Sequence, residues 1–324
     1  MTASGRPEYV TDLAATVAAR WRTLDPLLPE PVGARSGCGA ELRCETEGRL
    51  VATGTCQHWV GEPGSLELTW GAAQRYSLVP VVADPDVGGA LGQLLTGWAQ
   101  HLATAPHTDD PDTAAIVEWP SRDIDGVGAL LRHGLAPLSV IAARTTPPLS
   151  SEPGPGAAGA DGVLVRRAGS ADIEAVVRLG LETIRYDAHF GQVVERPHTA
   201  GALRTEMAGL LAAARPWVWL AERQGSFVGA LIAEPPDAAA WLAPMVRLAP
   251  VAYAMLMFVE PRERGRSIGA TLARHFHAEA AAARVPVTLL HYEQTNPLSA
   301  PFWAQQGYRP LWTSWQVRPA RALR

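Results

Sequence analysis

The feature that most restricts the fold of this 324-residue chain is an internal repeat. Three landmarks of the first half recur 177 residues later, and a fourth recurs 173 residues later, in the same order. The pairs are Gly48 and Gly225, Val82 and Val259, Gly92 and Gly269, and Asp123 and Asn296. An ordered repeat with so small a drift indicates duplication. We therefore predict two copies of one α/β unit, each large enough to bury its own core.

A segment rich in proline and glycine, 145–161, separates the copies, because it has neither a helical nor a strand period. We predict a first domain over 1–145, a linker over 146–161 and a second domain over 162–324. In the second domain, the hydrophobic pattern predicts the following elements: a strand and a helix with Ser170 as N-cap, two strands around a turn at Gln224 and Gly225, an apolar strand ending at Pro261, a helix over 265–283, a strand over 285–293, a helix over 296–306 ended by Gly307, and a final strand or two over 308–319.

The composition excludes several classes of protein. All 28 cationic side chains are arginines, which excludes Schiff-base lysine chemistry and the lysine of a Walker A loop. A formal net charge of −4 argues against nucleic acid as a partner. No apolar run is long enough for a secretion signal or a membrane span, so we expect a cytoplasmic protein with no membrane partner. Cys38, Cys44 and Cys56 lack disulfide or zinc spacing, so we expect reduced thiols and no metal.

The segment 258–272 has the pattern of an anion-binding turn. A strand stops at Pro261, and the helix that follows has the small residues Ser267 and Gly269 in its first turn. Free N–H groups and the helix dipole attract anions there, and Arg264 and Arg266 add positive charge. These residues predict a phosphorylated cofactor. A solvated basic loop before a well-capped helix is the alternative.

This segment resembles motif A of the GCN5-related N-acetyltransferases, the GNAT family, which reads Q/R-x-x-G-x-G/A between a strand and a helix. The sequence here is Arg264-Gly265-Arg266-Ser267-Ile268-Gly269, with Ser267 in place of the first glycine. Downstream, the family's N-x(5)-hydrophobic-Y-x(3)-G-F/Y pattern is matched by Asn296, Phe302-Trp303 and Gly307-Tyr308. The resemblance spans 163–319.

The resemblance implies an α/β (α+β) fold with two tandem GNAT-like domains. Each would have a twisted mixed, mostly antiparallel sheet flanked by helices, splayed where the pantetheine arm of acetyl-CoA inserts. Phe258 and Val259 would bond the pantetheine amides, and Asn296 and Phe302 would line the arm. The diphosphate would lie on the backbone of Arg264, Gly265, Arg266, Ser267, Ile268, Gly269 and Ala270.

The implied reaction is direct acyl transfer to a primary amine of a small molecule, for which a base and a thiolate acid are needed. His291 occupies a strand position where some family members carry a glutamate base, and Glu293, on the same strand face, would orient it. Glu234 and Glu260 are weaker candidates for the base.

Trp303 stands where many members carry the tyrosine that protonates the thiolate, and an indole N–H does not release its proton. Either dipoles stabilise the thiolate, or water or one of three tyrosines protonates it: Tyr253, Tyr292 or Tyr308. The segment 185–198 would contact the acceptor, and a solvated surface loop is the alternative.

The first copy departs from the family pattern at the residues that would bind acetyl-CoA. Val87 replaces the motif arginine, Asp84 and Asp86 add negative charge, and Asp123 replaces the asparagine. We expect this copy to be structural. The tandem layout resembles that of mycothiol synthase, although nothing in the sequence selects a substrate. A noncatalytic acyl-CoA-binding or scaffold protein is the alternative function, and the oligomeric state, monomer or homodimer, stays open.

Overall fold

The computed structural model describes residues 8–31, 39–83, 85–147 and 162–324. Cys38, Asp84 and linker residues 148–161 lie outside this set. The chain divides into two compact units. Unit 1 comprises the described residues within Met1–Gly61, Ala72–Val140 and Pro310–Arg324, and unit 2 those within Glu62–Gly71 and Ile141–Arg309. No helix formed by the described residues has both the length and the apolar character needed to cross a membrane.

Unit 1 has a mixed sheet with strands in the order β1-β2-β3-β4-β11. The β3–β4 pair is parallel, and the pairs β1–β2, β2–β3 and β4–β11 are antiparallel. The elements are α1 (Glu8–Leu24), β1 (Glu41–Thr46), β2 (Arg49–Val60), β3 (Gln74–Val82), α2 (Val87–Thr104), β4 (Thr113–Pro120), α3 (Val127–Arg132), part of β5 (Ala136–Thr145) and β11 (Arg309–Val317). The apolar face of α2, with Leu91, Leu95 and Trp98, packs in the core of this sheet.

Unit 2 repeats this plan, with the order β6-β7-β8-β9-β10-β5. Its elements are β6 (Val163–Arg167), α4 (Ile173–Asp187), α5 (Thr199–Leu211), β7 (Val218–Arg223), β8 (Ser226–Glu234), β9 (Val251–Val259), α6 (Ile268–Ala282), β10 (Val287–Glu293) and α7 (Ser299–Gln305). The strands from β6 to β9 pair antiparallel, and β9 pairs parallel with β10. The predicted mixed, mostly antiparallel sheets are confirmed.

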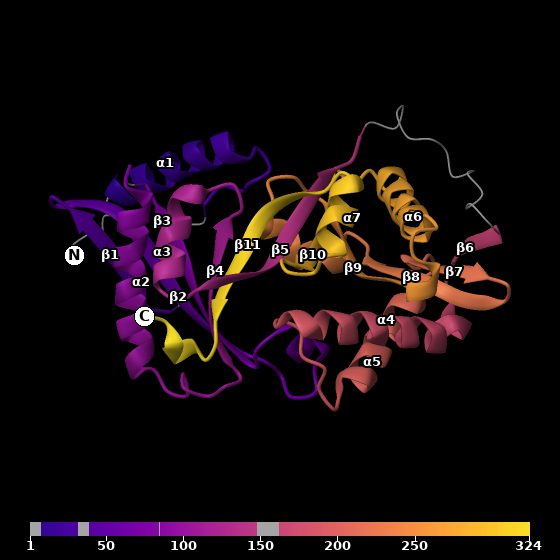
Figure 1. Ribbon diagram of the computed structural model, residues 1–324. Coiled ribbons are helices and arrows are strands. Elements are labelled where there is room, and N and C mark those ends of the chain that lie inside the picture. Colours follow the sequence, from indigo (N-terminus) through magenta and orange to yellow (C-terminus); the bar gives the residue numbers. More distant parts are fainter. Residues whose placement is uncertain (1–7, 32–38, 84, 148–161) are drawn as a thin grey trace, which may run out of the picture. The chain divides into compact units, whose positions relative to one another are not determined.

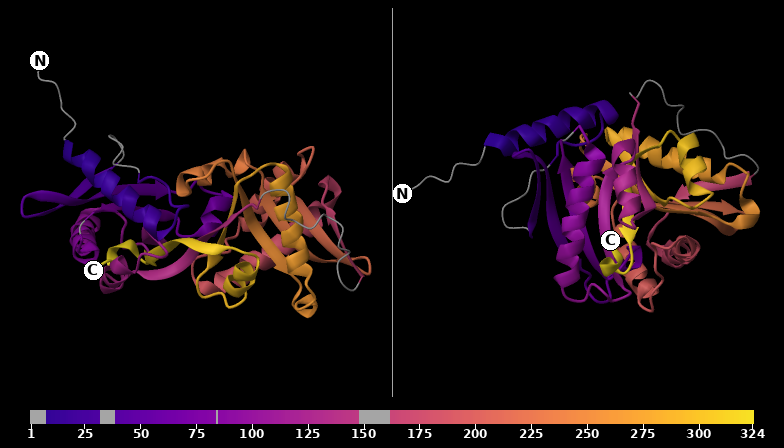
Figure 2. Two further views of the ribbon diagram at one scale, coloured as in Figure 1. Left: turned by 90° about the horizontal axis from the view of Figure 1, so that it is seen from above. Right: turned by 60° about the vertical axis from the view of Figure 1, so that its left-hand side comes forward.

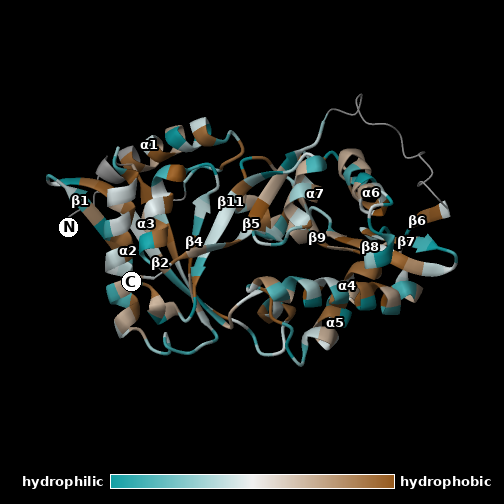
Figure 3. Cartoon of the chain, in the orientation of Figure 1, coloured by the Kyte–Doolittle hydropathy of each residue, from teal (hydrophilic) through white to brown (hydrophobic). Residues whose placement is uncertain are grey.

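Helices cover both faces of the sheet in unit 2 (Figure 1). Leu179 of α4 and Leu203 of α5 share a core with Ile232 and Leu256 of the strands. On the other face, a Cβ placed on Gly229 of β8 would lie 3.4 Å from Ile268 and Leu272 of α6. Both hydrophobic and hydrophilic colours appear on α4, as expected of a helix with one buried face (Figure 3).

The repeat predicted from the sequence is present in the element bounds. At the offset of 177, the first and last residues of β1 and β3 correspond to those of β7 and β9. At the offset of 173, Gly134 and Gly307 follow the helices α3 and α7, with φ angles of 85° and 86°. Glycine is favoured there because the left-handed conformation has no steric cost for it. The same local signals therefore build both copies.

One boundary prediction was wrong. Ser170 does not cap α4; it begins a short 3-10 turn, and α4 starts at Ile173 after Asp172. The Asp172 carboxylate accepts hydrogen bonds from the Gly169 amide at 2.9 Å and from Arg166 at 2.7 Å. Asp172 thus holds the N-cap position of α4, and its charge suits the helix dipole, although its side chain makes no capping hydrogen bond to that helix.

The two halves exchange segments between the units. The last strand of the chain, β11, lies beside β4 in unit 1, and Trp315 belongs to that unit's core (Figures 1 and 2). The last residues of β5 belong to unit 2, where β5 neighbours β10 and the Thr146 amide donates to the Pro286 carbonyl at 2.9 Å. A first-half segment, Glu62–Gly71, also belongs to unit 2.

Candidate active site

The site begins where two parallel strands of unit 2 separate. The register of β9 and β10 runs from Val251 opposite Val287 to Ala254 opposite Leu290. Both strands continue beyond that point, and a cavity of about 430 Å³ opens there. Its walls include Phe258 and Val259 of β9. A strand whose partner has diverged keeps backbone groups available for another extended chain.

A β-bulge lies in the wall of this cavity. Ile232 of β8 pairs with Leu256, but Ala233 pairs with Ala254, so Met255 is the extra residue on β9. The bulge leaves the extra residue without a ladder partner and changes the face to which later side chains point. Met255 and Leu256 both line the cavity. Their backbone therefore lies where the two strands part.

The loop between β9 and α6, which also lines the cavity, has the backbone form of an anion site. Gly265 and Ser267 have φ angles of 79° and 59°. The first bond of the helix runs from the Thr271 amide to the Ser267 carbonyl at 2.9 Å, so the amides of 268–270 precede any intrahelical acceptor. A Cβ placed on Gly269 would lie 3.1 Å from Phe302. Gly269 therefore keeps the cavity open between α6 and α7.

The charges around this loop are arranged so that its acidic residue is neutralised. Glu263 forms ion pairs with Arg223 and, at 3.5 Å, with Arg266. Arg264 donates from Nε to the Val259 carbonyl at 3.1 Å, and its guanidinium carbon lies 5.6 Å from the Tyr186 ring centroid. The loop keeps a positive balance of charge, as a phosphate ligand requires.

Asn296 lies at the end of β10 with its side-chain amide fully used. Its Oδ1 accepts hydrogen bonds from the amides of Leu298 at 3.0 Å and Ser299 at 3.3 Å, which caps α7. Its Nδ2 donates to Oδ1 of Asp187 at 3.1 Å. Asp187 is the last residue of α4 and also lines the cavity. The site thus contains a carboxylate that the sequence did not single out within 185–198.

Asp187 has an unusual environment for a carboxyl group. Burial raises its pKa to about 6, although the hydrogen bond from Asn296 lowers it. A carboxyl with a pKa close to neutrality can exchange protons under physiological conditions.

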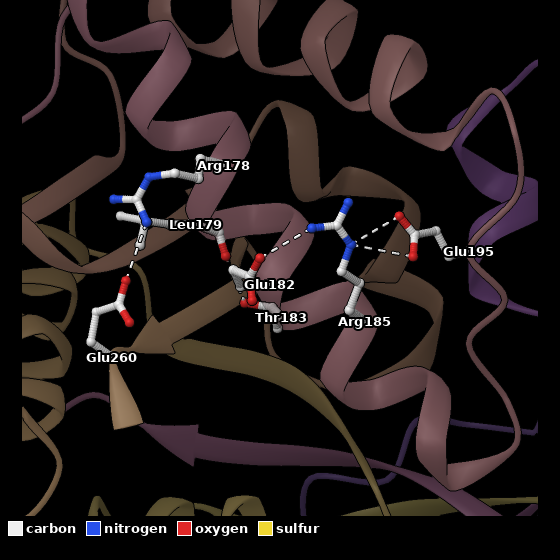
Figure 4. Close-up of polar contacts among 7 residues, drawn as sticks. All are labelled: Arg178, Leu179, Glu182, Thr183, Arg185, Glu195 and Glu260. Atoms are coloured by element: carbon white, nitrogen blue, oxygen red, sulfur yellow. Dashed lines mark hydrogen bonds and ion pairs between the residues drawn. The ribbon is translucent and has the colours of Figure 1, made fainter. Parts of the chain in front are cut away.

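Two ion pairs join α4 to the segments around it (Figure 4). Arg178 pairs with Glu260, just after β9, at 3.2 Å, and Arg185 pairs with Glu195 at 3.1 Å. The segment after α4 is fixed to Glu62–Gly71, where the Val194 amide donates to the Thr69 carbonyl at 2.9 Å. The helix that ends at Asp187 therefore has ion-pair partners just after β9 and in the segment that follows the helix.

His291 lines the cavity, and Glu293 is not among the described residues that do so. The His291 ring nitrogen Nδ1 lies 3.1 Å from the Tyr253 hydroxyl, and the ring is parallel to the Trp241 indole. Burial lowers the pKa of His291 to about 4, so its imidazole is neutral at pH 7. Glu293 is buried, and its carbonyl accepts from the Asn296 amide at 3.0 Å.

The predicted cofactor residues fall into two groups. Those that line the cavity are Phe258, Val259, Arg264, Gly265, Ser267, Ile268, Gly269, Ala270, Asn296 and Phe302. Arg266 lies beside the cavity in its ion pair with Glu263. Thus the two sequence segments matched to the family patterns meet at one cavity.

The aromatic residues considered for the leaving thiolate have different surroundings. Trp303 lines the cavity and packs on Phe302 and Tyr308, with ring centroids 4.9 Å and 5.2 Å away. The Tyr308 hydroxyl lies 2.9 Å from the Thr288 hydroxyl. Of the three tyrosines proposed, Tyr292 is the one among the described cavity residues, and burial raises its pKa.

In the first copy, the equivalent helix start is occupied by its own side chain. Oδ1 of Asp86 accepts from the Gly89 amide at 2.9 Å and so caps α2. Asp123, at the position of Asn296, forms an ion pair with Arg20. Carboxylates take the places that phosphate and asparagine would need. Over the described part of the chain, no group of three His, Cys, Asp or Glu side chains is arranged to hold a metal ion.

Comparisons with known proteins agree with this geometry. Residues 182–308 match the family model described as the acetyltransferase (GNAT) family. A GCN5-related N-acetyltransferase from Sphaerobacter thermophilus is similar in structure, with 15% identity, a TM-score of 0.58, and coverage of 97% of this chain and 95% of that chain.

Two further solved structures show weaker similarity. A GNAT-family acetyltransferase from Colwellia psychrerythraea has 14% identity, a TM-score of 0.47, and coverage of 96% of this chain and 97% of its own. A tandem GNAT protein from the clavulanic acid biosynthesis pathway has 14% identity, a TM-score of 0.48, and coverage of 98% and 97%. No curated protein matches the sequence. On the match at 182–308 and the site built there, the chain carries a GNAT acetyltransferase domain, and the protein is an acyltransferase.

Proposed function

We propose that this protein transfers an acetyl group from acetyl-CoA to a primary amine of a small molecule, by direct transfer within unit 2. The observation that carries the proposal is the cavity between β9 and β10, which leads from the bulge at Met255 to the open first turn of α6. A pantetheine arm is an extended chain with amide groups, and a diphosphate is an anion. The two ends of the cavity suit these two parts.

In this arrangement, the backbone of Phe258 and Val259 would pair with the pantetheine amides. The amides from Gly265 to Ala270 would hold the diphosphate, with Arg264 and Arg266 supplying charge. Asn296 and Phe302 would form the opposite wall. Asn296 would position the turn before α7 rather than bond the pantetheine arm, because its side-chain amide already bonds Asp187, Leu298 and Ser299.

The chemical step needs three functions from the protein. The backbone N–H groups at the Met255 bulge would stabilise the oxyanion, because a bulge frees such groups from the ladder. Tyr292 would protonate the departing thiolate, since it lines the cavity and its raised pKa keeps the phenol protonated. The assignment of the base to His291, oriented by Glu293, stays a prediction from the sequence. So does a cytoplasmic location.

Noncatalytic binding of acyl-CoA is the second candidate, and a specific observation favours it. Trp303 lines the cavity where many family members carry a tyrosine, and the low pKa of His291 makes that imidazole a weak base. In this case the protein would bind acetyl-CoA without consuming it.

Turnover against a panel of amines separates the two candidates. The purified protein is mixed with acetyl-CoA and each amine, and free thiol is followed colorimetrically, while calorimetry measures acetyl-CoA binding. Release of thiol that depends on one amine supports acetyl transfer. Tight binding with no thiol release for any primary amine would favour the noncatalytic protein.

A further inference from the structure

The Asp187–Asn296 contact places a carboxylate inside the cavity in a fixed orientation. The two residues are 109 positions apart in sequence and meet at 3.1 Å. Oδ1 of Asn296 is committed to two backbone donors of α7, so its NH2 group must be the donor toward Asp187. Asp187 therefore accepts this bond with one oxygen and has its second oxygen for another partner.

Few charged groups line the cavity around Asp187. The other ionisable groups that line the cavity are Tyr186 of α4, Glu263 and Arg264 of the loop after β9, and His291 and Tyr292 of β10. Glu263 and Arg264 are engaged with Arg223 and with the Val259 carbonyl. Among the described residues, Asn296 is the hydrogen-bond partner that the structure gives to the Asp187 carboxylate. A half-buried carboxylate with so few donors has a strong tendency to accept a proton.

We infer that Asp187 is the general base of the reaction, and that Asn296 is a positioning residue that orients it. This inference rests on the proposed acetyl transfer. It assigns the acceptor to the α4 side of the cavity, in reach of the free oxygen of Asp187.

The step balances as follows. The amine nitrogen forms a bond to the thioester carbon, and the C–S bond breaks with its electron pair going to sulfur. The nitrogen loses a proton to Asp187, and the thiolate gains one from Tyr292 or from water. Asp187 then returns its proton to solvent, and Tyr292, where it is the donor, regains one from solvent. No oxidant, reductant or covalent enzyme intermediate is needed.

Comparison with His291 supports this choice of base. Nδ1 of His291 is already within hydrogen-bond distance of the Tyr253 hydroxyl, and the imidazole has a pKa of about 4. The Asp187 carboxyl has a pKa of about 6 and is therefore the stronger base. A base is most effective when its pKa lies near the working pH.

The test is the pH dependence of kcat/KM in the full-length protein, with an acceptor amine whose own pKa is above about 9. The wild-type profile should show a break near pH 6. Asp187→Asn keeps the shape and can still accept from Asn296, and it should lower kcat by roughly 10²–10⁴-fold and remove the break. Glu182→Gln, on the same helix but in a surface pair with Arg185, is the matched control and should leave the profile unchanged.

A second variant tests the positioning role. Asn296→Ser keeps a helix-capping oxygen but loses the NH2 donor, and the donor lowers the pKa of Asp187. The break should therefore move to higher pH, which a purely structural loss would not cause. If Asp187→Asn failed to fold, the pH break in Asn296→Ser would test the inference alone: a shift to higher pH would support Asp187 as the base, and an unchanged break would contradict it.

The outcomes separate the inference from the proposed function. If wild-type protein releases thiol with an amine but Asp187→Asn keeps its rate within about fivefold, or keeps the break, Asp187 is not the base. A single break near pH 4 that disappears in His291→Gln would assign the role to His291 instead. Failure of wild-type protein to bind acetyl-CoA would overturn the proposed function itself.

Discussion

At the scale of single residues, the site depends on side chains that are missing or buried against their usual preference. Gly269 is needed because any Cβ there would press on Phe302, 3.1 Å away. Asp187 is half-buried although a carboxylate is more stable in water. The ionised carboxylate of Asp187 therefore lowers the free energy of unfolding, by an amount that depends on pH.

Asp187→Asn should stabilise the protein at pH 8 and leave its stability nearly unchanged at pH 4. Burial raises the carboxyl pKa from 3.8 to about 6, so the favourable neutral form is complete below pH 4 and is lost as the pH rises through 6. The ionised group then costs the folded state on the order of 2 kcal/mol. Urea unfolding at both pH values measures the effect. An equal difference between variant and wild type at the two pH values would contradict it.

Most of the predicted cofactor residues of the loop before α6 line one cavity, and they are neighbours in sequence. Gly265, Ser267 and Gly269 lie in one turn, where small residues indicate a backbone conformation or close approach that larger side chains would not allow. Asp187 could not be singled out, since its partner Asn296 is 109 residues away and no spacing rule connects them. The surroundings of His291 were equally hidden, because the contact with Tyr253 and its burial depend on the assembled sheet.

At the scale of elements, the pattern located the strands and helices of unit 2 but not all of their ends. The helix predicted from Gly265 begins at Ile268, because Ser267 adopts φ 59° and breaks the helical path before it. The bulge at Met255 had no signal in the apolar run of β9. Bulges in a uniformly apolar strand leave the hydrophobic pattern unchanged, so they become visible only through the register.

Ser267→Gly should stabilise the loop before α6. The left-handed conformation destabilises the folded state by about 1 kcal/mol for a residue other than glycine. Glycine removes most of this destabilisation, but its greater freedom in the unfolded chain offsets part of the gain. We expect a gain of roughly 0.5 kcal/mol in the free energy of unfolding, with acetyl-CoA affinity kept. Ser226→Gly, at a position with ordinary φ, is the control and should give no gain. A loss at Ser267 as large as at Ser226 would contradict this reading of the loop.

At the scale of the whole molecule, the duplication did not produce two self-contained halves. The offset of the repeat predicted two copies correctly, but each copy ends in a strand that belongs wholly or partly to the other unit: β5 and β11. A sequence pattern reports that a strand forms, while its neighbour in the sheet depends on the three-dimensional path of the chain. The exchange of β5 and β11 between the units therefore could not be predicted from the sequence.

The exchange predicts how fragments behave. The fragment 162–324 lacks the residues of β5 that neighbour β10, and it carries β11 without β4. We expect it to unfold without cooperativity and to bind acetyl-CoA weakly. The fragment 141–309 contains the observed unit except Glu62–Gly71 and should bind more tightly, as thermal unfolding and calorimetry would measure. If 162–324 bound as tightly as the full chain, the observed division into units would not govern folding.

Calorimetric titration of the full-length protein with acetyl-CoA tests the central claim, that the loop before α6 holds the nucleotide diphosphate. Wild-type protein should release or absorb measurable heat on binding. Gly269→Asp should abolish binding without unfolding the chain, because it adds bulk against Phe302 and a negative charge beside the free amides. Gly92→Asp, the equivalent position of the first copy, should leave binding intact. Absence of binding by the wild type, or equal binding by wild type and Gly269→Asp, would contradict the account.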